Sequence, residues 1–177
     1  MGELCGLPHE TIRERLSEGT LVSDYESGQI GDHEFHRRVQ ALLETSIGYE
    51  QFCEIWSSIF LPGTLIPETT IVELHKNYRL VLLSNTNGIH FEGLRTTRSI
   101  LSHFDAYVLS HEVKAMKPSP RIYAKAIEEA RCAPGEAFYT DDVAAYVEGA
   151  KLAGIDAVQF QDAEQIEGEL RARGVQW

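Results

Sequence analysis

Residues 79–87 have the sequence Arg79-Leu80-Val81-Leu82-Leu83-Ser84-Asn85-Thr86-Asn87, and this stretch decides the fold class. An unbroken apolar run that ends in turn-forming residues predicts a short β-strand buried on both faces. Strands of this kind belong to parallel sheets covered by helices. Ligands of such sheets bind beyond the carboxyl ends of the strands. We therefore expect Ser84 and Asn85 to offer a hydroxyl, an amide and backbone N–H groups to a small anion.

Size and composition set the broad class. The 177 residues are enough for one α/β domain with a small appendage, and an apolar content of 43% is ordinary for a protein with a buried core. A formal charge of −11 argues against a nucleic-acid partner and gives no reason to expect attraction to an anionic membrane. The three separated cysteines and the absence of a signal-like or membrane-length apolar run predict a cytoplasmic protein with reduced thiols.

Residues 1–62 show only helical patterns. Pro8 suits the start of a first helix, and Asp32 can cap a second. A third predicted helix, Glu50–Phe60, carries apolar and aromatic residues at helical spacing. This aromatic stripe indicates packing, with a substrate contact by Trp56 or Phe60 as the alternative. The region is expected to be a compact helical subdomain that ends near a candidate hinge at Pro62.

Residues 63–177 alternate between the two patterns. After a helix over Glu68–Lys76, apolar runs predict four short strands, at Leu80–Ser84, Tyr107–Ser110, Ala137–Thr140 and Ala157–Phe160. Helical patterns follow each of them, at Phe91–Phe104, Pro120–Arg131, Val143–Ala153 and Ala163–Arg173. Strand–helix alternation implies right-handed crossovers and a parallel sheet. The expected fold class is therefore α/β.

Asp141 and Asp142 directly follow the predicted strand Ala137–Thr140. Two adjacent carboxylates repel each other, so they need a cation or strong donors nearby. Mg²⁺ accepts oxygen ligands and few of them from the protein, which makes both aspartates candidate metal ligands. The alternative is that one of them caps the helix that begins at Val143. We expect both, with one carboxylate toward the cleft and the other toward backbone N–H groups.

Lys117 precedes Pro118, which restricts the backbone of the lysine to extended geometry and fixes the direction of its side chain. It is a candidate for binding negative charge at the same edge of the sheet. Lys114 is the rival candidate, and a solvated surface lysine is the plainer interpretation of either residue.

The chain contains a strand ending in Ser-Asn, a Lys-Pro before a helix and a strand ending in Asp-Asp. In this order and spacing they resemble the haloacid dehalogenase-like (HAD) superfamily of hydrolases over about residues 80–160. The likeness lies in Ser84–Asn87, in Ser110–Val113 with Lys117-Pro118, and in Tyr139–Asp142 with Val147–Ala150. Residues 1–62 are similar to the small helical cap of this superfamily, and residues 63–177 to its Rossmann-like core. The subgroup that looks nearest contains phosphatases related to the N-terminal domain of epoxide hydrolases and to small sugar-phosphate phosphatases.

The resemblance implies a catalytic chemistry and a site. An aspartate would attack the phosphoryl group of a small phosphorylated metabolite and form an aspartyl-phosphate. Ser84, beside Asn85, would hydrogen-bond the phosphoryl oxygens, and Lys117 would neutralise charge on the nucleophile and the phosphate. Asp141, with Asp142, would hold Mg²⁺.

The chain departs from this family pattern at one decisive point. The first motif of the family is a strand that ends in Asp-x-Asp, and the 177 residues contain no Asp-x-Asp. That first core strand is central in the family's sheet, so its absence leaves two interior edges unpaired. The flanking strands would close on each other, another chain would supply a strand, or the segment would lie upstream. A second departure is Tyr146, where the family commonly has Asn.

Without a nucleophile, the chain as written is predicted to have no appreciable phosphatase activity. A protein of another class, a non-catalytic binding or scaffold protein that keeps the fold, is the first alternative. A 2-haloacid dehalogenase is the second, although it needs the same aspartate and no metal. Unpaired edges also make a homo-oligomer plausible.

Overall fold

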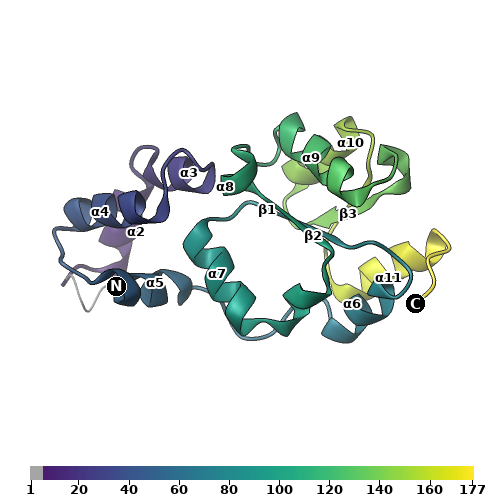
Figure 1. Ribbon diagram of the computed structural model, residues 1–177, viewed down its shortest axis with the longest axis horizontal. Helices are drawn as coiled ribbons and strands as arrows, with labels where there is room; N and C mark the ends of the chain where they lie inside the picture. Colours follow the sequence, from purple (N-terminus) through teal and green to yellow (C-terminus); the bar gives the residue numbers. More distant parts are fainter. Residues whose placement is uncertain (1–5) are drawn as a thin grey trace.

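A computed structural model describes residues 6–177, which leaves Cys5 outside the described part. Between residues 6 and 62 the chain forms four helices, to which we refer as the helical subdomain: α2 (His9–Ser17), α3 (Leu21–Glu26), α4 (Asp32–Leu43) and α5 (Tyr49–Ser57). They pack around Tyr25, Phe35 and Phe52, of which none is more than 1% exposed. Tyr25 and Phe35 stack with their ring centroids 4.1 Å apart. These helices lie at one end of the molecule, and their apolar cluster also takes in Ile89 from the second part of the chain (Figure 1).

Two details of this subdomain differ from the sequence prediction. The short helix α3 was not expected, because its six residues are too few to show a helical repeat. Asp32 does not cap the second helix: Gly31 holds the N-cap position, and the Asp32 carboxylate instead accepts a hydrogen bond from the Tyr25 hydroxyl. The aromatic stripe does pack, since Trp56 lies against Phe35 and Phe52.

The second part of the chain alternates helices and strands, as predicted. Its elements are α6 (Glu68–His75), β1 (Val81–Ser84), α7 (Gly88–Thr97), η1 (Ser99–His103), β2 (Ala106–Leu109), α8 (Ser110–Val113), α9 (Pro120–Ala130), η2 (Pro134–Glu136), β3 (Phe138–Asp141), α10 (Ala144–Leu152), β4 (Asp156–Gln159) and α11 (Ala163–Ala172). The helix predicted at Phe91–Phe104 is two elements, because the chain becomes extended at Arg98. No helix within residues 6–177 is long and apolar enough to span a membrane.

The four strands form two separate parallel pairs. Val81 to Ser84 of β1 align with Ala106 to Leu109 of β2, and Phe138 to Asp141 of β3 align with Asp156 to Gln159 of β4. Within residues 6–177, no strand hydrogen bonds join one pair to the other. Of the arrangements considered for the flanking strands, direct closure of β1 on β3 is therefore not the one adopted.

Helices cover both faces of the strand pairs (Figure 1). Leu83 of β1 and Tyr139 of β3 both pack into the cluster built by α9 and α10 around Ile122 and Tyr123. On the opposite face, Leu82 packs toward α7 and η1, whereas Phe138 and Val158 pack toward α6 and α11. One helical layer thus spans both pairs, which places the carboxyl ends of β1 and β3 beside each other.

Candidate active site

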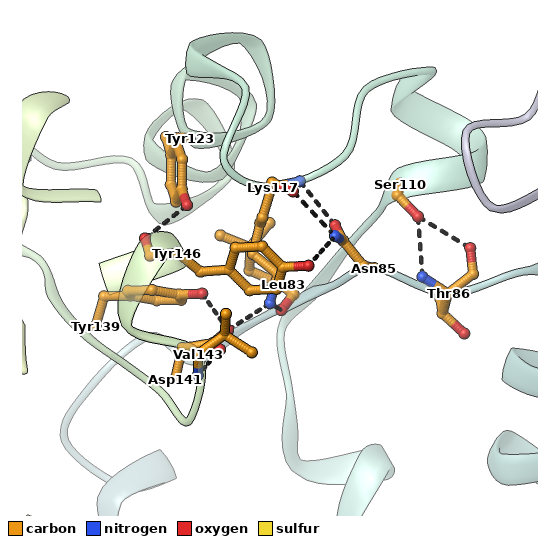
Figure 2. A network of polar contacts seen from close by, with 10 residues as sticks. All are labelled: Leu83, Asn85, Thr86, Ser110, Lys117, Tyr123, Tyr139, Asp141, Val143 and Tyr146. Atoms are coloured by element: carbon orange, nitrogen blue, oxygen red, sulfur yellow. Dashed lines mark hydrogen bonds and ion pairs between the residues drawn. The ribbon is translucent and has the colours of Figure 1, made fainter. Parts of the chain in front are cut away.

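The ammonium group of Lys117 lies between the carboxyl ends of β1 and β3 (Figure 2). Its Nζ is 2.5 Å from Oδ2 of Asp141 and 3.3 Å from the carbonyl oxygen of Leu83. The two side chains are only 7% and 8% exposed. Ser84 directly follows Leu83, so the structure brings the serine, the lysine and the acidic pair of the sequence prediction to one edge of the strands.

Asp141 is held by three donors. Its Oδ2 also accepts from the Tyr139 hydroxyl at 2.6 Å, and its Oδ1 accepts from the N–H of Val143 at 2.9 Å. Burial alone would raise the pKa of Asp141, but the hydrogen bonds from Lys117, Tyr139 and Val143 outweigh it and lower that pKa. Asp141 therefore remains ionised and paired.

The prediction that one aspartate would point to the cleft and the other to backbone N–H groups is wrong. Asp141 supplies both contacts, because its two oxygens point to the ammonium group and to the start of α10. Asp142 is exposed, and its backbone carbonyl accepts from the side chain of Gln159. The physical reason is the end of the strand, since β3 stops at Asp141 and Asp142 lies in the exposed bend that follows it.

Asn85 contacts the main chain of Lys117 rather than open space. Its Oδ1 accepts from the Lys117 N–H at 2.8 Å, and its Nδ2 donates to the Lys117 carbonyl at 3.2 Å. The amide thus pairs with both backbone groups of one residue, much as a neighbouring strand would. Its Nδ2 also lies 3.3 Å from the hydroxyl of Tyr146 (Figure 2). In this geometry Asn85 is a positioning residue for Lys117.

Two tyrosine rings enclose the ammonium group. The ring centroid of Tyr146 lies 5.0 Å from Lys117 Nζ, and that of Tyr139 lies 5.9 Å away, both within the range of cation–π attraction. Burial, with the Asp141 carboxylate next in importance, raises the pKa of Tyr139, so its hydroxyl keeps its proton and donates. The backbone of Tyr146 is held in place by the Tyr123 hydroxyl, which donates to the Tyr146 carbonyl at 2.6 Å.

Ser84 and Lys114 take different positions from these residues. Ser84 ends β1, opposite Leu109 of β2, and is half-buried. Lys114 is exposed at the end of α8, with a left-handed φ of 55°. Of the two candidate lysines, only Lys117 is buried at the strand ends.

Two residues that shape the loop after β1 lie in the stretches that carry the family likeness, but the sequence assigned them no role. Asn87 is fully buried and caps α7, because its Oδ1 accepts from the N–H of His90 at 3.0 Å. Ser110, also fully buried, accepts from the N–H of Thr86 at 2.9 Å, and its Oγ lies 2.6 Å from the carbonyl of Glu26 in the helical subdomain. An Asn three residues before His90 is a capping signal, whereas Ser110 was marked only by the family likeness of Ser110–Val113, which assigned it no contact.

The helical subdomain docks closely at this edge. Gly28, at a φ of +69°, lies against the carbonyl of His111, where a Cβ atom would come within 1.9 Å of the oxygen. Only glycine permits both that backbone conformation and that approach. A cavity of about 730 Å³ lies apart from Lys117, between α5 and α7, and Phe60 is among its lining residues. The substrate-contact alternative for Phe60 would place a ligand there.

The described residues do not by themselves form a Mg²⁺ site. Within residues 6–177, no three acidic, histidine or cysteine side chains gather where they could hold a metal ion. Asp141 is already paired with Lys117, whose positive charge opposes a cation at the same carboxylate. Asp142, which is exposed after the end of β3, is then the one carboxylate of the pair that is not engaged by Lys117.

Comparison with known proteins places this geometry in a family. The chain is 23% identical over 167 residues to D-ribitol-5-phosphate phosphatase of Bacteroides thetaiotaomicron, covering 91% of this chain and 81% of that protein. A crystal structure of a HAD family enzyme from B. thetaiotaomicron, in complex with magnesium and inorganic phosphate, matches with a TM-score of 0.78 and 25% identity over 86% of this chain and 80% of that one. A HAD-like family hydrolase of Porphyromonas gingivalis matches with a TM-score of 0.77 and 25% identity over 94% and 84%.

The family model for haloacid dehalogenase-like hydrolases matches residues 62–160, which contain Ser84, Asn85, Lys117 and both aspartates. The match covers more than half of the chain and includes every strand of the structure. The chain therefore belongs to the haloacid dehalogenase-like hydrolase family.

Proposed function

We propose that this chain carries the anion-binding and charge-neutralising part of a phosphomonoesterase site. The observation that carries the proposal is the buried ammonium of Lys117 at the carboxyl end of β1, 2.5 Å from Asp141. A buried cation beside a serine at the carboxyl end of a strand is suited to a phosphoryl group. The phosphatase relative, similar over most of this chain, supports a small phosphorylated metabolite such as a sugar or polyol phosphate as the substrate class.

The proposed chemistry proceeds through an aspartyl-phosphate, and the nucleophile is the component that these 177 residues do not supply. No Asp-x-Asp occurs in the sequence, and β1 and β3 are not paired where such a strand would end. Ser84 would donate to a phosphoryl oxygen, and Lys117 would balance the charge of the phosphate. Mg²⁺ dependence belongs to the same proposal, because Asp141 is paired with Lys117 and the Asp-x-Asp segment would supply a further carboxylate for the metal. The chain as written is therefore expected to be inactive.

A non-catalytic binding protein is the second candidate, and one observation favours it. Lys117 is already neutralised by a carboxylate of the same chain, so the fold does not need a ligand to satisfy the buried charge. Such a protein would keep the cap, the strand pairs and the ion pair but would turn over no ester.

Two versions of the protein test the proposal. We expect the 177-residue chain, assayed with p-nitrophenyl phosphate, ribitol 5-phosphate and Mg²⁺, to show no turnover above buffer. The same chain extended at its N-terminus by an apolar strand ending in Asp-x-Asp is expected to gain Mg²⁺-dependent phosphatase activity. In the extended protein, Lys117→Ala should abolish that activity, whereas Lys114→Ala, a matched change at an exposed lysine, should leave it intact.

The outcomes of these assays separate the candidate functions. Phosphatase turnover at ordinary enzyme rates by the 177-residue chain would show that a residue within the chain acts as the nucleophile. A folded, extended protein without activity would favour the binding-protein candidate. Equal activity of the Lys117→Ala and Lys114→Ala variants would remove Lys117 from the mechanism.

A further inference from the structure

The two strand pairs share a helical layer but no backbone hydrogen bonds within residues 6–177. At their carboxyl ends a side-chain bridge joins them instead. The ammonium of Lys117 donates to the Leu83 carbonyl of β1 and to the Asp141 carboxylate of β3. One side chain thus contacts both pairs at the point where they come together (Figure 2).

The surroundings of this bridge make it strong and difficult to replace. Both charged side chains are more than nine-tenths buried, and the rings of Tyr139 and Tyr146 cover the ammonium. Breaking a buried ion pair by removing one partner leaves the other charge buried without compensation. The backbone of Lys117 is fixed as well, because Asn85 bonds both its N–H and its carbonyl.

The same contacts occupy the lone pairs of Asp141 that a metal would use. Oδ2 accepts from Lys117 and Tyr139, and Oδ1 accepts from Val143, which leaves one lone-pair direction of the carboxylate. A divalent cation in that direction would stand close to a buried ammonium, and within residues 6–177 no cluster of three acidic, histidine or cysteine side chains is present to offset the repulsion.

We propose that Lys117, Asp141 and Tyr139 form a structural bridge that joins the two strand pairs and that holds Asp141 away from divalent cations in this chain. The candidate active-site residues Lys117 and Asp141 would thus also have a structural role, which is to hold the two strand pairs together. The tests of this bridge measure binding and hydrogen exchange of the 177-residue chain and need no enzymatic turnover. Their result is therefore independent of the proposed phosphatase function.

The first test uses the wild-type chain with Mn²⁺ as the probe. We expect the Lys117 ammonium to appear in a ¹⁵N NMR spectrum as a slowly exchanging signal, since buffer cannot reach it. Added Mn²⁺ should leave the ring signals of Tyr139 and Tyr146 unbroadened up to millimolar concentration. Saturable broadening of these rings that disappears in Asp141→Asn would overturn the proposal, because it would show Asp141 coordinating a cation.

The second test measures the joining of the strand pairs by backbone hydrogen exchange. Lys117→Met retains most of the side-chain volume but removes the charge, and it should accelerate exchange in both β1 and β3 by at least about tenfold, as expected for loss of a buried ion pair. Lys125→Met is the matched control, because Lys125 forms ion pairs with Glu128 and Glu129 on the exposed surface of α9. It should leave both strands unchanged.

Lys117→Met should also bind Mn²⁺ where the wild type does not, and Asp141→Asn in that background should abolish the binding. If Lys117→Met fails to fold, Tyr139→Phe replaces it, since it removes one donor to Asp141 and keeps the ion pair. Tyr139→Phe should accelerate exchange in both strands by a smaller factor. Acceleration confined to one strand, or none in either variant, would overturn the structural role.

Discussion

The Tyr25 hydroxyl, in the helical subdomain, accepts a hydrogen bond from the N–H of Ile89, in the first turn of α7, at 3.1 Å. The same hydroxyl donates to Oδ1 of Asp32 at 2.7 Å, and the Tyr25 side chain is 1% exposed. Since α7 begins immediately after the loop Ser84–Asn87, this contact links the helical subdomain to the loop that positions Lys117.

Tyr25→Phe removes the hydroxyl and keeps the stacking on Phe35. It leaves the buried N–H of Ile89 without a partner, so we expect the free energy of unfolding to fall by about 1–3 kcal/mol. Urea denaturation followed by tryptophan fluorescence measures the change.

Tyr78→Phe is the matched control, because Tyr78 is 38% exposed and its hydroxyl accepts from the N–H of Gln176 near the C-terminus. Water can replace that hydroxyl, so the effect should be within about 0.5 kcal/mol. An equal decrease in the free energy of unfolding in the two variants would show that the Tyr25–Ile89 hydrogen bond adds no stability beyond that of an exposed tyrosine hydroxyl.

Gly149 and Gly168 are both inside helices, but alanine should act on them in opposite directions. A Cβ at Gly149 would lie 2.8 Å from the hydroxyl of Tyr123 and 3.0 Å from Cβ of Pro118, whereas a Cβ at Gly168 would meet nothing within 4 Å. We expect Gly149→Ala to destabilise the protein by about 1–3 kcal/mol through overpacking. Gly168→Ala should stabilise it by about 0.5–1 kcal/mol through helix propensity. Thermal unfolding of the two variants side by side checks both signs, and stabilisation by Gly149→Ala would contradict the packing of α10 on Lys117-Pro118.

Asn85 is expected to act on the position of Lys117. Asn85→Ala removes two hydrogen bonds to the Lys117 backbone and should cost about 1–3 kcal/mol of stability. Asn85→Asp keeps the acceptor for the Lys117 N–H but places a carboxylate against the Lys117 carbonyl, so it should recover only part of the loss. Chemical denaturation gives the energies, and the NMR shift of the Lys117 N–H reports its position. An unchanged N–H shift in Asn85→Ala would show that the loop is held by other contacts.

His90 makes stability depend on pH. Burial lowers the pKa of His90 from its ordinary value of 6.5, and the hydrogen bond to the Trp56 carbonyl opposes this only in part. Because the amide nitrogen of Asn87 can only donate, Nδ1 of His90 accepts from it and Nε2 donates to Trp56. The neutral ring is thus the form that fits.

A folded-state pKa below the unfolded one contributes stability that is complete above about pH 6.5 and is lost as the pH falls through the folded pKa. We therefore expect the free energy of unfolding to decline from pH 6.5 downward, and His90→Phe to remove this part of the slope. A His90 ring that titrates at or above pH 6.5 by NMR would contradict the assignment.

Local sequence patterns were sufficient for the order of elements. Apolar runs such as Leu80–Leu83 and the helical spacing of Pro120–Arg131 depend on periodicity alone, and the structure has a strand and a helix at both places. The resemblance over residues 80–160 was confirmed by the family match at residues 62–160. The short helix α3 and the break at Arg98 were not predicted, because a few residues are too short to show a helical repeat.

What the sequence by itself determined was therefore the family, the α/β alternation and the residue types at the strand ends. Only the tertiary structure decided that Lys117 rather than Lys114 is buried and that Asp141 makes both contacts expected of two aspartates. It also decided that, within residues 6–177, β1 and β3 do not pair with each other. The reason is physical: periodicity is a property of neighbours in the chain, whereas Lys117 meets Asp141, 24 residues away, only because α9 and α10 pack on both strand pairs at once.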